Sequence, residues 1–278
     1  MMIVAVALLT TMSALVKVID TSYHPAQITF MRSIIAMAFI LPFVIRAGGI
    51  SVLKTKRPGL HLMRSLAGTL GNILFFYSFQ KMTVGDVIVI SQAVPLFVTI
   101  CAVLFLREQV GIRRWLAILF GFFGVIIAID PVGNFDATSL IAVAATGCWA
   151  STILFMRRLG ATESPYAVAF YFMAICSLIT ACVQPFVWQL PTPRMLLLVL
   201  GIGFTGAIGQ ILMTTALKYA QASVISPFNY TGILWAVGFD LIIWGVIPTW
   251  TTVVGAGVIT ITGVYIFHRE SIIRQKSI

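Results

Sequence analysis

Ten long apolar runs, separated by short segments that hold charges, glycine or proline, dominate this sequence. Most of the runs approach or exceed the roughly 20 residues that a helix needs to cross the hydrocarbon core of a bilayer. None alternates polar and apolar residues as a membrane β-barrel strand does, so we predict helices. The pattern indicates an all-α membrane protein with ten transmembrane helices near residues 1–19, 27–45, 61–80, 85–106, 113–130, 137–156, 166–187, 194–217, 222–245 and 249–267.

The composition excludes a water-soluble globular domain. Of the 278 residues, 60% are hydrophobic and only 9% are charged, whereas soluble domains carry about 25% charged residues. The net charge of +10 would suggest nucleic-acid binding in a soluble protein, but basic residues gather in the cytoplasmic loops of membrane proteins. We therefore expect a lipid bilayer as the main partner and no nucleic-acid partner.

The distribution of lysine and arginine predicts the orientation of the chain. Most of the 18 basic residues, among them Lys54, Arg57 and Arg64, fall in segments that share one side of the membrane if the N-terminus is cytoplasmic. We therefore predict that both termini are cytoplasmic, in a plasma membrane of the bacterial inner-membrane type. The first run lacks a preceding basic region and a convincing cleavage pattern, so we interpret it as a retained helix and not as a signal peptide.

Two parts of the sequence resemble each other. An offset of 140 places the second run on the seventh, and an offset of 138 places the third on the eighth, with Asn72 on Gln210. Each copy would hold five spans, an odd number, so the copies would face opposite ways across the membrane. We predict a five-helix repeat at 1–132, an inverted repeat at 133–270 and a cytoplasmic tail at 271–278. Inverted repeats are typical of secondary transporters, which bind solute between the halves.

The order of small, polar and acidic residues is similar to that of a known family. The first repeat of the drug/metabolite transporter superfamily, EamA type, resembles LKTKRPGLHLMRSLAGTLGNILFFYSFQKM and VISQAVPLFVTICAVLFLREQVGIRRWLAILFGFFGVIIAI. The matching features are Pro95, Glu108 at the end of the fourth run, and Gly121 with Gly124. The second repeat resembles ALKYAQASVISPFNYTGILWAVGFDLIIWGVIPTWTTVVGAGVITITGVYI. There Val246 stands where the family often has an acidic residue, which indicates that a second acidic site is not essential to transport.

This resemblance implies ten helices around a central cavity, with solute–proton antiport or uniport and no nucleotide hydrolysis. A GxxxxGK[ST] loop, which binds nucleotide phosphates, does not occur in the sequence. The first half is most similar to members that move S-adenosylmethionine or riboflavin, and relatives also export amino acids. We predict a secondary transporter for a small organic metabolite of one of these kinds, working by alternating access with or without proton coupling.

An intramembrane enzyme and an ion channel are the alternatives. An enzyme requires a nucleophile and base, or a metal site, within the spans, and we find no such constellation. The four cysteines and three histidines lack the spacing of metal ligands, so we predict no metal and no cofactor. A channel would be expected to contain a filter-like loop or a ring of charges.

Two charged residues lie inside predicted spans. Arg32 lies more than one turn within the second run, and Asp240 lies in the outer third of the ninth. Ionisable groups at such depth meet a partner, face a hydrated cavity or snorkel to the membrane surface. One hypothesis pairs Arg32 with Asp240 in a fixed salt bridge. The other assigns Asp240 to proton coupling or to binding a substrate ammonium group.

Polar and aromatic residues at depth are the candidates for solute binding. Groups related by the pseudo-symmetry of two repeats converge near the midplane of the membrane, whereas the alternative is that amides hold neighbouring helices together. The amide and hydroxyl candidates correspond in pairs at the 138 offset, and the aromatic ones would stack on a flat ring. The candidates are Asn72, Phe76, Ser91, Trp149, Gln210, Asn229 and Tyr230.

The fifth and tenth runs are rich in small residues. They contain Gly121, Gly124, Gly255, Gly257 and Gly263. Glycine lets the backbones of two membrane helices approach closely. A homodimer formed through these two helices is therefore a further expectation.

Overall fold

The computed structural model describes residues 1–106, 112–130, 136–160, 162–219 and 226–275, and these ranges contain helices and no strand. The first half holds α1 (Met2–Val18), α2 (Pro25–Arg46), η1 (Gly49–Leu53), α3 (Pro58–Lys81), α4 (Val84–Ser91), α5 (Val94–Leu106) and α6 (Ile112–Ile129). The second half holds α7 (Thr138–Gly160), α8 (Pro165–Ala181), α9 (Gln184–Val187), α10 (Pro193–Tyr219), η2 (Ser226–Tyr230), α12 (Thr231–Trp244) and α13 (Trp250–Gln275).

The apolar helices make this a multi-pass membrane protein. Four segments are long and apolar enough to cross a bilayer on these criteria alone: Pro25–Arg46, Val84–Cys101, Thr138–Gly160 and Pro193–Ala216. Several others, such as Met2–Val18 and Trp250–Tyr265, are apolar but shorter. The number of ten spans stays a prediction, because some predicted runs are divided between more than one helix.

Three predicted spans are interrupted. The fourth run breaks at Gln92–Ala93, between α4 and α5, and the ninth consists of η2 followed by α12. The seventh ends at Ala181, before the short helix α9. Proline explains the first break, because Pro95 lacks an N–H and cannot donate to the carbonyl four residues earlier.

Some predicted boundaries differ from the structure or fall beyond it. The helix α13 continues to Gln275, so the first residues of the tail predicted at 271–278 are helical, and the boundary at 271 stays a prediction. A membrane helix ends where its hydrogen bonds end, which is not where its apolar run ends. Glu108, the boundary near 132 and residues 276–278 lie outside the described residues.

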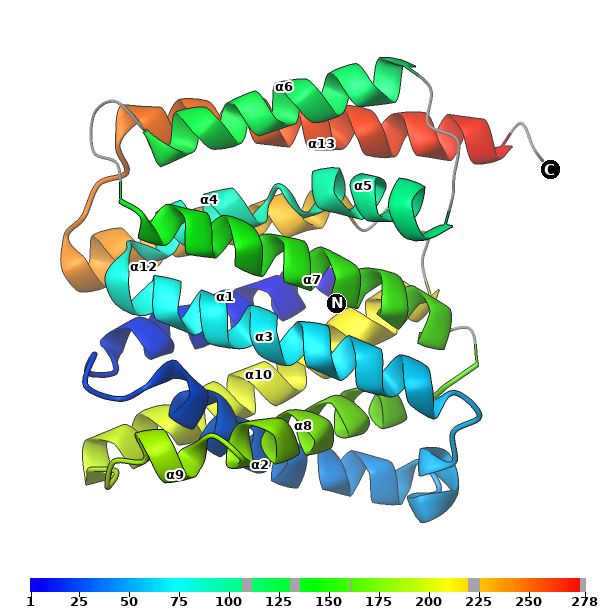
Figure 1. Ribbon diagram of the computed structural model, residues 1–278, viewed down its shortest axis with the longest axis vertical. Helices are drawn as coiled ribbons and strands as arrows, with labels where there is room; N and C mark the ends of the chain where they lie inside the picture. Colours follow the sequence, from blue (N-terminus) through cyan, green and yellow to red (C-terminus); the bar gives the residue numbers. More distant parts are fainter. Residues whose placement is uncertain (107–111, 131–135, 161, 220–225, 276–278) are drawn as a thin grey trace.

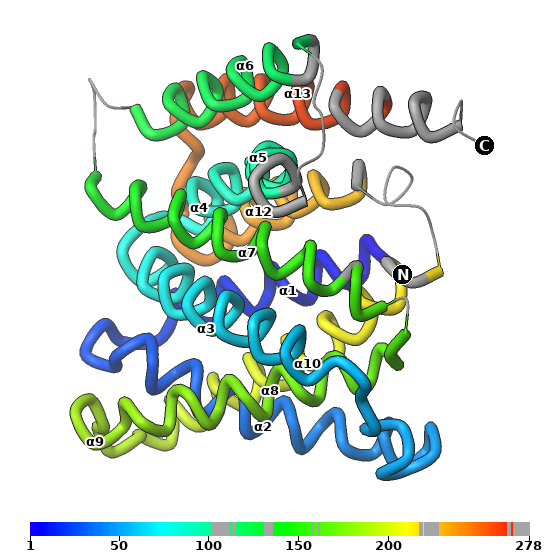
Figure 2. The backbone as a smooth tube through the Cα atoms, turned by 45° about the vertical axis from the view of Figure 1, so that its right-hand side comes forward, coloured from blue at the N-terminus to red at the C-terminus, as the bar shows by residue number. Residues whose placement is uncertain are grey.

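The helices lie side by side in tiers along the longest axis of the molecule (Figure 1). One end is formed by α6 and α13 and the other by α2 and α8, with α1, α3 and α7 between them, as Figure 2 shows from a second direction. Extensive contacts join α1 with α10, α3 with α7, α2 with α8 and α6 with α13. Each of these pairs contains one helix from residues 1–129 and one from residues 138–275.

Glycines of the predicted fifth and tenth spans pack within one chain. A Cβ atom on Gly255 would lie 2.8 Å from the carbonyl oxygen of Gly124, and one on Gly124 would lie 2.9 Å from Val258. The two glycines therefore let α6 and α13 approach at backbone distance. Their packing has an explanation inside the monomer, and the homodimer stays an expectation.

The loops that connect the helices contact one another at both ends of the helix axes. At one end Thr55 donates to a carboxylate oxygen of Glu163 at 2.8 Å, which joins the segment after η1 to the segment after α7. At the other end Gln27 donates to the carbonyl of Gln189 at 2.6 Å, which joins the start of α2 to the segment before α10. Predicted cytoplasmic loops thus contact one another, and so do predicted external loops.

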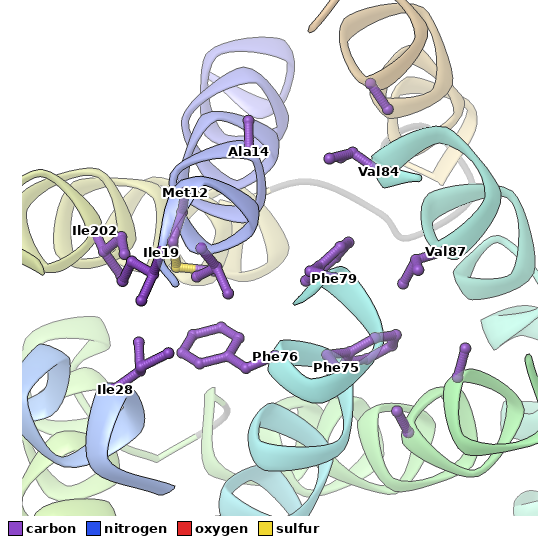
Figure 3. Close-up of a cluster of buried hydrophobic side chains, with 14 of the residues drawn as sticks. Met12, Ala14, Ile19, Ile28, Phe75, Phe76, Phe79, Val84, Val87 and Ile202 are labelled. Atoms are coloured by element: carbon purple, nitrogen blue, oxygen red, sulfur yellow. The ribbon is translucent and has the colours of Figure 1, made fainter. Parts of the chain in front are cut away.

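The largest core cluster lies where α1, α2, α3, α4, α7 and α10 meet. Figure 3 shows Phe76 extending from α3 toward Ile28 of α2, on the side of Met12, whereas Phe79 lies toward Val84 and Val87 of α4. These aromatic rings fill the centre of the bundle. The same region contains the cavity described next.

Candidate functional site

A cavity of about 200 Å³ lies at the centre of the bundle. Its walls come from α1, α3, α4, α5, α7, α10, η2 and α12. Six of the predicted site residues line it, and three come from each half of the chain: Asn72, Phe76, Ser91, Trp149, Asn229 and Tyr230. Ser91 and Asn229, which the 138 offset relates, thus line the same cavity.

Irregular backbone borders this cavity from both halves. Ser91, Gln92 and Pro95 lie at the break between α4 and α5, and Asn229 and Tyr230 lie in η2. Non-helical backbone at membrane depth is tolerated where it is buried in protein or lines a cavity. Interrupted helices at corresponding positions of two halves are the usual location of a transporter's solute site.

The amide groups of the cavity leave hydrogen-bonding capacity unused. The Nδ2 atom of Asn72 has no hydrogen-bond partner in the described part of the chain, although the side chain is buried. Gln92 uses one amide hydrogen to donate to the carbonyl of Asn229 at 3.2 Å, which joins the two breaks. Asn72 therefore combines a position in the cavity wall with a buried donor that has no partner among the described residues.

Tyr230 contributes a ring and a buried hydroxyl group. Its hydroxyl oxygen has no partner among the described residues and lies against Gly263 of α13, where an added Cβ would overlap it. Gly263 is thus required to leave space for the phenol. The sequence analysis identified Gly263 only as one of several glycines that could let helices pack closely.

The helix α1 supplies a wall that the sequence did not reveal. Thr10 and Ser13 line the cavity, and their hydroxyl groups donate to the carbonyls of Val6 and Leu9 in the same helix. Isolated threonine and serine residues in an apolar run are common, so no pattern marked them. The only available signal is that both lie on one face of the helix, three residues apart.

Gln210 does not line this cavity. Its amide nitrogen lies 3.6 Å from Sδ of Met156 and 3.5 Å from the hydroxyl of Thr214. It therefore connects α10 with α7, which is the second of the two roles considered for it. The correspondence between Asn72 and Gln210 holds in sequence, but only Asn72 faces the cavity.

The predicted salt bridge between Arg32 and Asp240 is wrong. Asp240 is paired with Lys17 of α1, with 3.3 Å between Nζ and Oδ1. The carboxylate also accepts hydrogen bonds from the backbone N–H groups of Val84, at 3.1 Å, and Gly85. Asp240 satisfies the first N–H groups of α4, which have no partner within their own helix, and its charge suits the positive end of that helix.

Two arginines are buried away from Asp240. Arg32 lies under the ring of Phe76, with 5.6 Å from Cζ to the ring centre, and does not reach the membrane surface. Arg64, predicted to be a cytoplasmic charge, is fully buried and stacks on Phe172 at 4.3 Å. Because α3 begins at Pro58, Arg64 lies nearly two turns inside the helix, where it contacts Met156 of α7 and Val168 of α8.

Comparisons with known proteins agree with this architecture. The model of the EamA-like transporter family matches residues 1–129 and 137–268. A riboflavin transporter of Vibrio cholerae is 29% identical over 247 residues, which cover 88% of this chain and 83% of that protein. An S-adenosylmethionine uptake transporter of Rickettsia bellii is 27% identical, covering 94% and 90% of the two chains. A pseudopaline exporter of Pseudomonas aeruginosa is 26% identical, covering 90% and 88%.

The fold has a counterpart among solved structures. One crystal structure matches with a TM-score of 0.66 over 95% of this chain and 93% of that chain, at 16% sequence identity. A likeness at this level of identity concerns the fold alone.

Proposed function

The chain belongs to the EamA-like transporter family, and on this premise we propose that it is a secondary transporter that works by alternating access. Its solute is a small organic metabolite, either a vitamin such as riboflavin, a compound like S-adenosylmethionine or an amino-acid-type solute. Relatives named for riboflavin and S-adenosylmethionine transport support this range. The solute binds between two halves of the chain, residues 1–132 and 133–270, and the movement of one half against the other changes its exposure.

The observation that carries the proposal is the cavity itself. Both halves contribute polar and aromatic side chains to it, and both do so at interrupted helices. A solute held at such a place changes its exposure when one half moves against the other. An enzyme or a channel needs neither of these features.

The packing of the helices supports an inverted repeat. In the predicted repeat α1 corresponds to α7 and α3 corresponds to α10. The contact of α1 with α10 therefore corresponds to the contact of α7 with α3, and both contacts are present. The pairs α2 with α8 and α6 with α13 correspond to themselves. A contact pattern that survives exchange of the two halves is expected if a two-fold axis relates the halves, and the family model also matches the chain twice.

The separation of the loops supports the predicted topology. Loops assigned to the cytoplasm by their basic residues meet at one end of the bundle, where Thr55 contacts Glu163. Loops assigned to the outside meet at the other end, where Gln27 contacts Gln189. Both termini are cytoplasmic in this proposal, and the membrane is the plasma or inner membrane.

A thermal-shift screen of the purified protein tests the proposal. Amino acids, riboflavin, S-adenosylmethionine and nucleosides are added singly, and the one that is transported raises the melting temperature because it binds the folded form. The variant Trp149→Phe, which alters the cavity wall, is expected to weaken the shift. Trp115→Phe, on the exposed surface of α6, is the matched control. Equal loss of the shift in both variants, or no shift with any metabolite, would contradict the proposal.

A further inference from the structure

Arg32 carries a buried charge that its surroundings do not neutralise. Only 2% of the residue is exposed, and its Nε and Nη1 atoms have no hydrogen-bond partner in the part of the chain that the structure describes. Among those residues, no carboxylate lies within 4.0 Å of the guanidinium. An uncompensated buried charge is strongly unfavourable, so this position requires a reason.

The second buried arginine, Arg64, has more partners than Arg32. Arg64 donates to the carbonyl of Val168 at 3.4 Å and to Sδ of Met156 at 3.1 Å. It also stacks on an aromatic ring at a shorter distance than Arg32 does. Arg64 therefore has a structural role in joining α3 to α7 and α8. Of its guanidinium nitrogens only Nε lacks a partner among the described residues, whereas Arg32 lacks partners at both Nε and Nη1.

Arg32 lies directly behind the wall of the cavity. Phe76, whose ring covers the guanidinium, and Met12 both line the cavity. A Cβ atom added to Gly206 would lie 3.0 Å from Sδ of Met12 and 3.3 Å from Nε of Arg32, so the two side chains flank the same glycine. Figure 3 shows Met12 and Phe76 projecting from α1 and α3 into the same region of the core.

The cavity is smaller than a metabolite with a ring system requires. Its volume is about 200 Å³, whereas pockets for small molecules occupy about 300–1,000 Å³. A metabolite with a ring system therefore needs more space. Methionine is a flexible side chain that adapts easily, and the unpartnered donors of Arg32 lie behind Phe76 and Met12.

We propose that Arg32 binds an oxyanion of the transported solute, a carboxylate or a phosphate, after Phe76 and Met12 move aside. A guanidinium offers two parallel N–H donors that match the two oxygens of such a group. The aromatic wall then receives the ring of the solute. This inference rests on the function proposed above and narrows it to metabolites that carry both a ring and an anionic group.

Pairs of small probes test the inference on the full chain in neutral detergent. Benzoate is compared with benzamide, and phenyl phosphate with benzyl alcohol, at constant ionic strength, with the melting temperature as the readout. We expect one of the two anions to stabilise the protein more than its neutral counterpart. Which anion does so distinguishes a carboxylate from a phosphate. In Arg32→Gln the same anion is expected to bind at least about tenfold more weakly.

Arg46→Gln is the matched control, because Arg46 is an exposed arginine at the end of the same helix. If Arg32→Gln does not fold, Arg32→Lys keeps the charge but removes the paired donors, and it too is expected to lose most of the anion-dependent shift. Phe76→Ala removes the wall and is expected to increase the shift. Equal stabilisation by anionic and neutral probes, no stabilisation by either anion, or an unchanged shift in the Arg32 variants would overturn the inference.

Different binding results would contradict the role of Arg32 and the proposed transport function. A neutral metabolite that binds equally well to the wild type and to Arg32→Gln would preserve the transporter proposal and overturn the role of Arg32. Absence of binding by every metabolite, neutral or charged, would count against the transporter proposal itself.

Discussion

Removing the carboxylate of Asp240 is expected to destabilise the packing of α1, α4 and α12. This side chain joins three helices, because it lies on α12, pairs with Lys17 of α1 and accepts from the backbone of Val84 and Gly85 at the start of α4. Asp240→Ala leaves the ammonium of Lys17 without its partner. It also leaves the first N–H groups of α4 unsatisfied.

The expected loss follows from the burial of the pair. The side chains of Lys17 and Asp240 are 15% and 4% exposed, so both charges are largely removed from solvent. Breaking a buried pair by removing one partner costs about 3–5 kcal/mol. Lys17 keeps some solvent contact and also lies 4.6 Å above the ring of Trp244, which stabilises a cation. We therefore expect the lower end of the range, about 3 kcal/mol of unfolding free energy.

Unfolding in mixed micelles at increasing SDS fraction, followed by circular dichroism, measures this loss. Asp20→Ala, which removes a carboxylate from an exposed loop, is the control and is expected to change stability by less than about 0.5 kcal/mol. The double variant Lys17→Met with Asp240→Asn removes both charges and is expected to be more stable than Asp240→Asn alone. A loss below about 1 kcal/mol in Asp240→Ala, or strictly additive effects in the double variant, would refute the reasoning.

The same variants separate the two roles considered for Asp240. If the pair with Lys17 is structural, Asp240→Asn lowers folded yield and leaves the pH dependence of transport unchanged. If Asp240 couples protons, the pH dependence of transport in proteoliposomes changes even in the fraction that folds. The structure favours the first outcome, because three donors already occupy this carboxylate.

Three further predictions concern other parts of the molecule. Gly263→Ala should destabilise the protein by about 1–3 kcal/mol through overlap with the hydroxyl of Tyr230, and Tyr230→Phe should restore part of this loss in thermal unfolding. Asn72→Leu should change the free energy of unfolding by less than about 1 kcal/mol, because the amide nitrogen has no partner among the described residues. It should nevertheless abolish the solute-induced shift in melting temperature. Ile50→Cys and Thr162→Cys, made without the native cysteines, should react with an impermeant maleimide from the same side of the membrane, and labelling from opposite sides would contradict the topology.

The sequence predicted the cavity better than it predicted individual contacts. The 138 offset relates whole helices, and Ser91 and Asn229, which it pairs, line the same cavity. Gln210 has the helix-packing role of the two considered for it, because a rotation of one helix by a fraction of a turn moves a side chain from a cavity into a helix interface.

Charged partners were harder to predict for a similar reason. Depth in the membrane can be read from the position of a residue in its run, and this correctly marked Arg32 and Asp240 as unusual. The direction in which a side chain points and the helices that surround it depend on tertiary packing. The pairing of Lys17 with Asp240 across α1 and α12 is an example, because the two residues are 223 positions apart in the sequence.

The interruption of the fourth run had a visible signal. Pro95 follows two polar residues, Ser91 and Gln92, in an otherwise apolar stretch, and this combination marks a place where helical hydrogen bonds are given up. The corresponding break in the ninth run was less evident from the sequence. It lies at Pro227, close to residues that the structure does not describe.

The contact between Gly124 and Gly255 has a mechanical consequence. It brings one helix of each half to backbone distance along a single edge of the bundle, so in the alternating-access motion proposed above this edge would act as a pivot. A rigid rotation about a pivot displaces atoms in proportion to their distance from it. In any such rocking motion α2 and α8, at the far edge, travel the widest arc, while the side chains next to α6 and α13 stay almost still.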